Sequence, residues 1–269
     1  MRKIIGVLLL SGMLLWGGEN DSLVFKTIGV AETFYLPVSS ENGYTINISF
    51  TWPDGYKDPE ILKKLQRQFL TKNFGEDYAD MTAEEALQTF YRSEVESYKE
   101  ENGDIASDET WSLAWEYHSE NKILFHNADI LQYAINYWQF SGGAHGTGGT
   151  SYSLLDLKTG NELSAADIFK AGTEDKIREL IIPGLLTYWE AKSLDDVVDE
   201  DGKKDLMDNL WQPGTNFGVT ATGIIFSYSD YELGYYALGQ PESLVPWEKI
   251  LPCLREDSPV WPVAAAGGR

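Results

Sequence analysis

The chain has 269 residues, of which 43% are hydrophobic and 23% charged, the balance of a folded protein with a substantial core rather than of a disordered chain. Its 42 Asp and Glu side chains outnumber 21 Lys and Arg side chains, which gives a formal net charge of −21. Nucleic-acid binding requires a basic face that displaces counterions from phosphate, so we expect no nucleic-acid partner. The acidity would suit a cationic partner, with plain solubility as the alternative.

The first 18 residues have the pattern of an export signal. Arg2 and Lys3 precede an apolar run from Ile4 to Leu10, which is too short to span a bilayer. Residues 10–12 read Leu-Ser-Gly, as before the lipidated cysteine of a bacterial lipoprotein, but the next residue is Met13. We therefore expect an extracytoplasmic protein (periplasmic, surface-bound or secreted) that is not lipidated, with no transmembrane helix beyond this segment.

The first half of the chain predicts one strand followed by two helices. Residues 44–52 alternate between apolar and polar side chains, the period of a half-buried strand. Asp58 followed by Pro59 is a helix start, and Thr82 with Glu85 forms a capping box for a second helix that ends at residues 102–103.

The second half predicts several strands interleaved with short helices. Alternation continues over residues 111–117, and Asn121 suggests a hairpin before a strand around 123–127. Ser164 with Asp167 opens a short helix, and a longer one begins at Thr173, with a kink or an end at Pro183. Further strands are expected at residues 131–140, 151–157, 217–220 and 224–228.

This order of elements predicts an α+β fold of antiparallel sheets with packed helices, in two associated lobes. We place the N-terminal lobe at residues 24–140 and the C-terminal lobe at residues 141–254. The Ala- and Gly-rich residues 255–269 are expected to form a flexible tail.

The Gly-rich loop at the start of the second lobe is the first candidate ligand-binding segment. It contains Ser141, Gly142, Gly143 and His145, and its glycines allow positive φ angles and close approach of a ligand to the backbone. It lacks the Lys and Ser/Thr of a phosphate-binding P-loop. His145 would be a ligand contact or a general base; the alternative is a histidine hydrogen-bonded within a tight loop.

The C-terminal tyrosines are the second candidate segment. Tyr231, Tyr235 and Tyr236 would present rings to a ligand, with core packing as the alternative role.

Metal, cofactor and catalytic motifs are not evident in the sequence. The single cysteine, Cys253, excludes an intrachain disulfide and a thiolate zinc cluster, and the three histidines lack HExxH spacing. Asp199 to Gly202 is similar to a calcium loop, but Val197 occupies the position of the first ligand, which favours a solvated helix face or turn. No GxSxG motif is present. We expect no metal, no cofactor and no catalytic residues.

Three segments together resemble a family of extracytoplasmic domains of unknown function, which occurs in the lysozyme-sensing anti-sigma factor RsiV and before the catalytic domain of the peptidoglycan deacetylase PdaC. The matching residues are Tyr137 with 141–145, then 156–160 followed by 163–169, and then 231–234, 236–237, 239 and 244–246. The resemblance implies an α+β fold in two parts and a binding module at the cell envelope. Its ligand would be a protein such as a lysozyme, or peptidoglycan or another cell-wall glycan. The alternative is a carbohydrate- or peptidoglycan-modifying enzyme with a site near His145.

Overall fold

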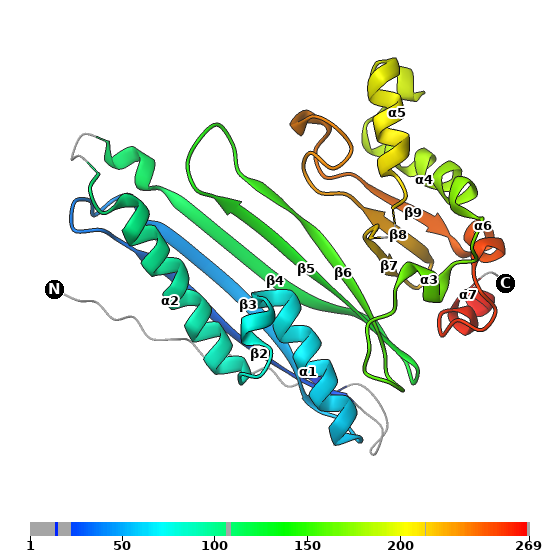
Figure 1. Cartoon of the computed structure of the whole chain (residues 1–269), viewed down its shortest axis with the longest axis horizontal. Coiled ribbons are helices and arrows are strands. Elements are labelled where there is room, and N and C mark those ends of the chain that lie inside the picture. Colours follow the sequence, from blue (N-terminus) through cyan, green and yellow to red (C-terminus); the bar gives the residue numbers. More distant parts are fainter. Residues whose placement is uncertain (1–13, 16–22, 106–108, 213, 268–269) are drawn as a thin grey trace. The chain divides into compact units, whose positions relative to one another are not determined.

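The computed structural model describes residues 14–15, 23–105, 109–212 and 214–267 (Figure 1). Apart from residues 14–15, the expected signal segment 1–18 lies outside this range. The chain divides into two compact units: unit 1 comprises residues 1–121 and 135–147, and unit 2 comprises residues 122–134 and 148–269. This division differs from a single boundary at residue 141, because two long strands each run from one unit into the other.

The α+β class is confirmed, but the larger sheet is mixed rather than antiparallel. Its strand order is β1-β2-β3-β4-β5-β6, with β2 and β3 antiparallel and β3 and β4 parallel. The parallel pairing follows from the long connection through two helices between β3 and β4. These strands are β1 (Leu14–Leu15), β2 (Val24–Phe34), β3 (Tyr44–Gly55), β4 (Trp115–His126), β5 (Ile130–Phe140) and β6 (Thr147–Asp156).

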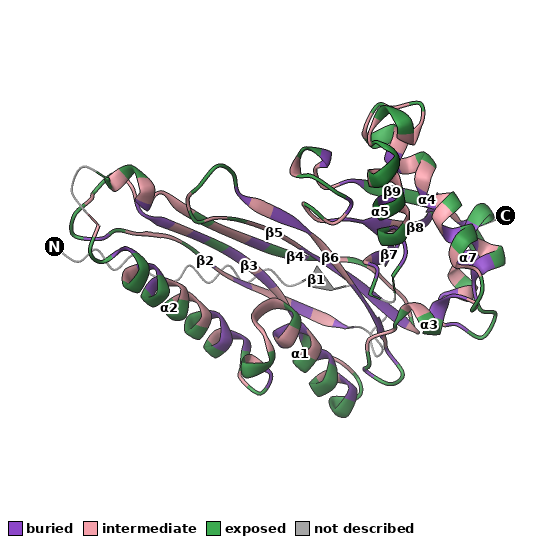
Figure 2. Ribbon diagram, turned by 45° about the horizontal axis from the view of Figure 1, so that its top comes forward, coloured by how far each residue is buried: buried purple, intermediate pink, exposed green. Residues whose placement is uncertain are grey.

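The two helices of unit 1 begin where the sequence predicts. In α1 (Pro59–Phe74) the Asp58 carboxylate accepts hydrogen bonds from the amides of Glu60 and Ile61 at 2.9 and 3.1 Å. In α2 (Ala83–Asn102) the capping box of Thr82 and Glu85 is present. Figure 2 shows both helices lying along the sheet, with exposed residues on their outer sides.

Alternate side chains of β3 make the core beneath these helices. Ile46 and Phe50 are fully buried, and the Phe50 ring lies 5.0 Å from that of Phe74 in α1. The Tyr44 ring lies 5.4 Å from that of Tyr98 in α2. The strand predicted from alternation is therefore confirmed, with its apolar face covered by the helices.

The predicted hairpin at Asn121 is wrong. Asn121 lies within β4 and is buried, and its side-chain amide hydrogen-bonds to both the backbone N–H and the C=O of Thr51 in β3, at 2.5 and 2.8 Å. The backbone pairing of β3 with β4 ends at Ser49 and Glu120, so this side chain extends the ladder by one step. The turn occurs instead at Asn127, whose carboxamide oxygen accepts hydrogen bonds from the backbone N–H groups of Asp129 and Ile130.

Unit 2 packs short helices and a second sheet around one core. The antiparallel sheet has the order β7-β8-β9, and α4 lies against β9, where Gly184 allows close contact with Ser243. The helix α4 continues through Pro183 rather than ending there. The elements are α3 (Ala165–Ile168), α4 (Glu174–Tyr188), a 3-10 turn (Leu194–Asp196), α5 (Glu200–Asn209), β7 (Phe217–Val219), β8 (Gly223–Ser227), β9 (Glu242–Pro246), α6 (Trp247–Ile250) and α7 (Trp261–Gly267).

Residues 255–269, expected to form a flexible tail, contain α7. Val260 and Ala264 are fully buried in the core of unit 2. A terminal segment of small residues is expected to fray when it contacts no other part of the protein. Here the small side chains of α7 allow the helix to pack closely against the core of unit 2.

Replacing Asn121 with Ala is expected to destabilise the protein by about 2 kcal/mol, because the N–H and C=O of Thr51 lose their partners. The free energy of unfolding in urea measures this loss. Asn47→Ala, at an exposed position of the neighbouring strand, is the control and is expected to change stability by less than about 0.5 kcal/mol. Equal effects of the two substitutions would contradict the ladder role of Asn121.

Candidate functional site

A groove of about 780 Å³ on unit 2 is lined by acidic and tyrosine side chains. Its walls are the segment from the 3-10 turn to α5 and the segment 231–235. Tyr231, Leu233 and Tyr235 contribute from the second segment. The first segment contributes five aspartates: Asp195, Asp196, Asp199, Asp205 and Asp208.

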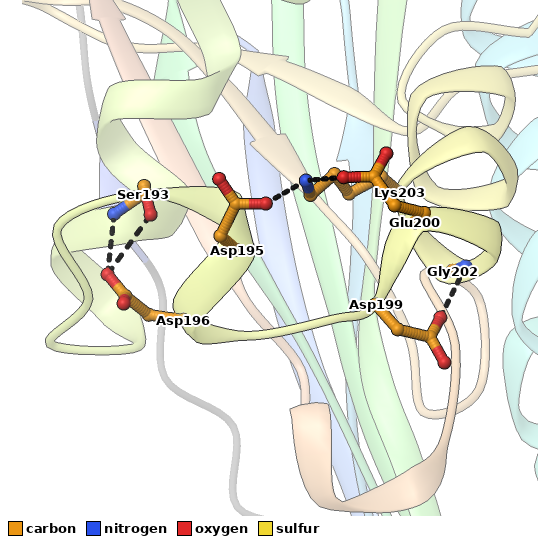
Figure 3. A network of polar contacts seen from close by, with 7 residues as sticks. All are labelled: Ser193, Asp195, Asp196, Asp199, Glu200, Gly202 and Lys203. Atoms are coloured by element: carbon orange, nitrogen blue, oxygen red, sulfur yellow. Dashed lines mark hydrogen bonds and ion pairs between the residues drawn. The ribbon is translucent and has the colours of Figure 1, made fainter.

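Two of these aspartates serve local structure. The Asp196 carboxylate accepts from the amide and hydroxyl of Ser193 at 2.9 and 3.2 Å, and Asp199 caps α5 by accepting from Gly202 N at 2.9 Å (Figure 3). Asp195 pairs with Lys203 in the same network. The stretch forms a turn and a helix.

The other two aspartates lie on exposed turns of α5. Asp208 pairs with Lys204 at 2.8 Å, and this hydrogen bond holds the pKa of the Asp208 carboxyl below its usual range. Asp205 is exposed, and its side chain makes no hydrogen bond or ion pair with the part of the chain that the structure describes. This side of the groove therefore presents carboxylates to an incoming ligand.

Tyr231 and Tyr235, two of the residues predicted to bind a ligand, line the opposite side of the groove. Each is 56% exposed. The Tyr235 hydroxyl donates to the carbonyl oxygen of Val197 across the groove at 2.9 Å. Tyr236 packs against Tyr231, with ring centroids 5.5 Å apart and a 44° angle between the rings. The rings are thus held in place while much of their surface stays exposed.

The turn that carries these tyrosines is tightly hydrogen-bonded. Tyr231 has φ of 68°, a left-handed conformation that costs free energy for a residue with a side chain. On one side of it, the Asp230 carboxylate accepts from Gly148 N at 3.0 Å and from Gln240 Nε2 at 2.8 Å. On the other side, Glu232 accepts from the amide of Ser229 at 2.8 Å. These bonds offset the strain and fix the direction of the turn.

The Gly-rich loop, the first predicted ligand-binding segment, lies in unit 1 and the tyrosines lie in unit 2. Ser141 is exposed, and Gly142 and Gly143 have φ of 90° and 91°, which only glycine adopts easily. His145 is exposed, with its Nδ1 atom 3.2 Å from the carbonyl oxygen of Gly146. Gly146 is buried, and a Cβ atom there would lie 2.4 Å from the Trp138 ring. The positive φ angles and the close approach of Trp138 therefore explain why glycine occupies these positions.

A second, polar groove of about 450 Å³ lies on unit 1. It crosses strands β3, β4 and β5, where Asn47 stands beside His118 and Ser49 beside Glu120 in the parallel register. Trp138 and Asn136 complete it from β5.

No group of three or more His, Cys, Asp or Glu side chains that could hold a metal ion occurs within the described residues. In the same part of the chain, no helix is both long and apolar enough to span a bilayer.

The fold and the groove define an α+β protein with an acidic, tyrosine-flanked groove. Residues 166–248 match the family model described as a protein of unknown function, DUF3298. This match confirms, for that region, the resemblance to a domain of unknown function, and it includes every residue that lines the acidic groove.

Two solved structures are similar to the chain. A member of the DUF3298 family from Bacteroides fragilis has a TM-score of 0.78 and 23% identity, over 93% of this chain and 100% of that one. A DUF3298 family protein from Pseudomonas aeruginosa PAO1 has a TM-score of 0.57 and 17% identity, over 88% and 96% of the two chains. At these identities the likeness shows a shared fold. No curated protein matches the chain.

The acidic wall of the groove is the part that sequence reasoning missed. The sequence analysis interpreted only residues 199–202, as a solvated helix face or turn. The position of the five aspartates opposite Tyr231 and Tyr235 arises from a contact between distant segments. The available signal was the density of Asp between residues 195 and 208 in a chain that also has a tyrosine-rich segment.

Replacing Glu232 with Gln is expected to stabilise the protein at neutral pH. Burial raises the pKa of the Glu232 carboxyl, opposed in part by the hydrogen bond from Ser229, so its ionised form costs stability when folded. This cost falls as pH drops through the folded pKa and vanishes below the unfolded value near ~4.3.

Urea unfolding at a series of pH values measures the difference between Glu232→Gln and the parent protein. Glu41→Gln, at an exposed position, is the control and should show no such pH-dependent difference. A Glu232→Gln protein that is less stable than the parent at pH 7 would contradict the raised pKa of the Glu232 carboxyl in the folded protein.

Proposed function

We propose that this protein is an exported, non-catalytic binding module of the cell envelope whose ligand is a cationic protein, with a lysozyme as the leading example. The observation that carries the proposal is the meeting of aspartate side chains and half-exposed tyrosine rings in one groove. The resemblance to the RsiV and PdaC domains supports a protein ligand or a cell-wall ligand. The pattern of Arg2, Lys3 and the apolar run after them supports export.

Lysine and arginine side chains suit such a groove for two physical reasons. Their charged heads form charge-assisted hydrogen bonds to carboxylates such as that of Asp205, and their heads also lie favourably over aromatic faces such as that of Tyr231. Excess negative charge over the whole chain would speed the encounter with a basic protein.

Affinity for a lysozyme at about 0.15 M salt, where the Debye length is ~8 Å, tests the proposal. Tyr235→Ala is expected to weaken binding about tenfold, because it removes a ring from the centre of the contact. Tyr235→Phe keeps the ring and is expected to weaken binding less. Calorimetry or biolayer interferometry gives the dissociation constants.

A matched pair of charge substitutions separates the groove from general acidity. Asp205→Asn removes a carboxylate from the groove, and Asp77→Asn removes an exposed one from unit 1. Binding that weakens only with Asp205→Asn supports the groove. Binding that is weakened equally by both substitutions, or that disappears at physiological salt, would contradict the proposal.

A cell-wall glycan is the second candidate ligand, favoured by the polar groove on unit 1. Asn47, His118 and Asn136 offer donors and acceptors for sugar hydroxyls beside the Trp138 ring. Co-sedimentation with purified peptidoglycan, lost in Trp138→Ala but kept in Tyr235→Ala, would assign the glycan to this groove.

An enzyme with a site near His145 is the alternative class. Turnover of a carbohydrate or peptidoglycan substrate that is abolished by His145→Ala would replace the binding-module proposal.

A further inference from the structure

A second pocket of unit 2, of about 970 Å³, has the opposite chemistry to the acidic groove. It lies between α3, the first turns of α4, residues 211–212 and Arg255. Three cationic side chains line it: Lys170, Arg178 and Arg255. In a chain with twice as many acidic as basic side chains, this convergence of cations is unusual.

Each of the three cations is positioned by a main-chain carbonyl. Lys170 Nζ donates to Pro252 O at 3.3 Å, Arg178 Nη2 donates to Trp211 O at 3.3 Å, and Arg255 Nη1 donates to Ala166 O at 3.0 Å. A carbonyl is a neutral acceptor, so it orients a cation without cancelling its charge.

The carboxylates near these cations lie on exposed positions or are engaged elsewhere. Asp175 pairs with Arg178 at 2.6 Å but is 97% exposed, and Asp257 pairs with Arg255 at 2.8 Å and is 72% exposed. The Asp175 pair is weak because water competes for both charges. Asp257 accepts from both Nε and Nη2 of Arg255, at 3.0 and 2.8 Å, so an entering anion must compete with it for that guanidinium. The Glu174 carboxylate, which also lines the pocket, accepts from Gly172 N at 3.1 Å. An entering anion can therefore compete most readily for the Arg178 guanidinium.

The Arg178 guanidinium has unused hydrogen-bonding capacity. Its Nε atom is buried, and it has no hydrogen-bond partner among the described residues. A buried N–H without an acceptor is unfavourable, and a two-oxygen anion accepts from adjacent N–H groups of one guanidinium. A small shift of this side chain towards the pocket would allow that bond.

The remaining wall is apolar. Phe169 and Trp211 meet edge to face, with ring centroids 5.0 Å apart, and Ile177 lies beside them in the pocket lining. The pocket therefore combines an oxyanion-binding side with an apolar side.

We propose that this pocket binds an oxyanion, a carboxylate or a phosphate, attached to an apolar group. Arg178, Lys170 and Arg255 hold the anion, while Phe169 and Trp211 contact the apolar group. Such ligands include aromatic acids and the C-terminal carboxylate of a peptide that ends in an apolar residue. The pocket is separate from the acidic groove, and Tyr235→Ala should leave its binding unchanged.

Titration of the full chain with 3-phenylpropionate, with phenyl phosphate and with the neutral 3-phenylpropanamide, followed by NMR, tests this proposal. We expect at least one of the two anions to bind about 10-fold or more tightly than the amide, because charge-assisted hydrogen bonds are lost in the amide. The tighter of the two anions identifies the source of the oxyanion. Equal affinity for the acids and the amide would overturn the proposal.

Variants locate the binding within the unit. Lys170→Gln and Arg255→Gln should each weaken anion binding, and Asp257→Asn, which removes a competing carboxylate, should tighten it. Lys176→Gln is the matched control: it removes the same charge from α4 at a residue outside the pocket lining. Weakening by Lys176→Gln as large as by Lys170→Gln, or no effect of the Asp257→Asn substitution, would show that the pocket is not the site.

Discussion

The geometry of the acidic groove depends on the hydrogen bonds that the Asp230 carboxylate accepts. This carboxylate accepts from the amide of Gly148, where β6 begins, and from the side chain of Gln240, which lies beyond the tyrosine turn. Two bonds to one carboxylate join segments that are far apart in the sequence. They hold the turn in which Tyr231 adopts a left-handed backbone.

From this anchor, the arrangement of the groove follows in steps. A fixed turn sets the position of Tyr235, whose hydroxyl reaches the carbonyl of Val197 on the other wall. That bond ties the tyrosine segment to the acidic segment at one point. The aspartates nearest the 3-10 turn cap helical segments, and those further along α5 remain available to solvent and to ligands.

Clusters of acidic and of basic side chains line separate pockets of unit 2. Within unit 2, carboxylates collect in one groove, and three cations collect in a separate pocket. Under the two proposals, these sites select ligands of opposite charge, because each repels the ligand of the other. We infer that this region is a recognition unit, and both of its sites involve residues within the segment 166–248 that matches the DUF3298 model.

Local signals in the sequence were sufficient for the helix starts and for several strands. Asp58 and the pair Thr82 and Glu85 act within four residues of themselves, so their roles were predictable. Asn121 was not, because its partner Thr51 is 70 residues away, and an isolated Asn suggests a turn. The parallel pairing of β3 with β4 and the burial of Ala264 depend in the same way on distant partners.

The candidate site shows the same limit. Tyr231 and Tyr235 were identified from local composition, and they do line a groove. Its acidic wall and the cationic pocket were not predicted, since each is assembled from separate segments. The Gly-rich loop was the more prominent motif, yet the backbone path and the Trp138 ring explain its glycines.

Hydrogen–deuterium exchange of the full chain, with and without a saturating lysozyme, tests the central claim most directly. The account predicts that the ligand slows exchange in residues 195–208 and 231–235, the two walls of the acidic groove. Protection confined to other segments, or no protection when lysozyme is bound, would contradict it.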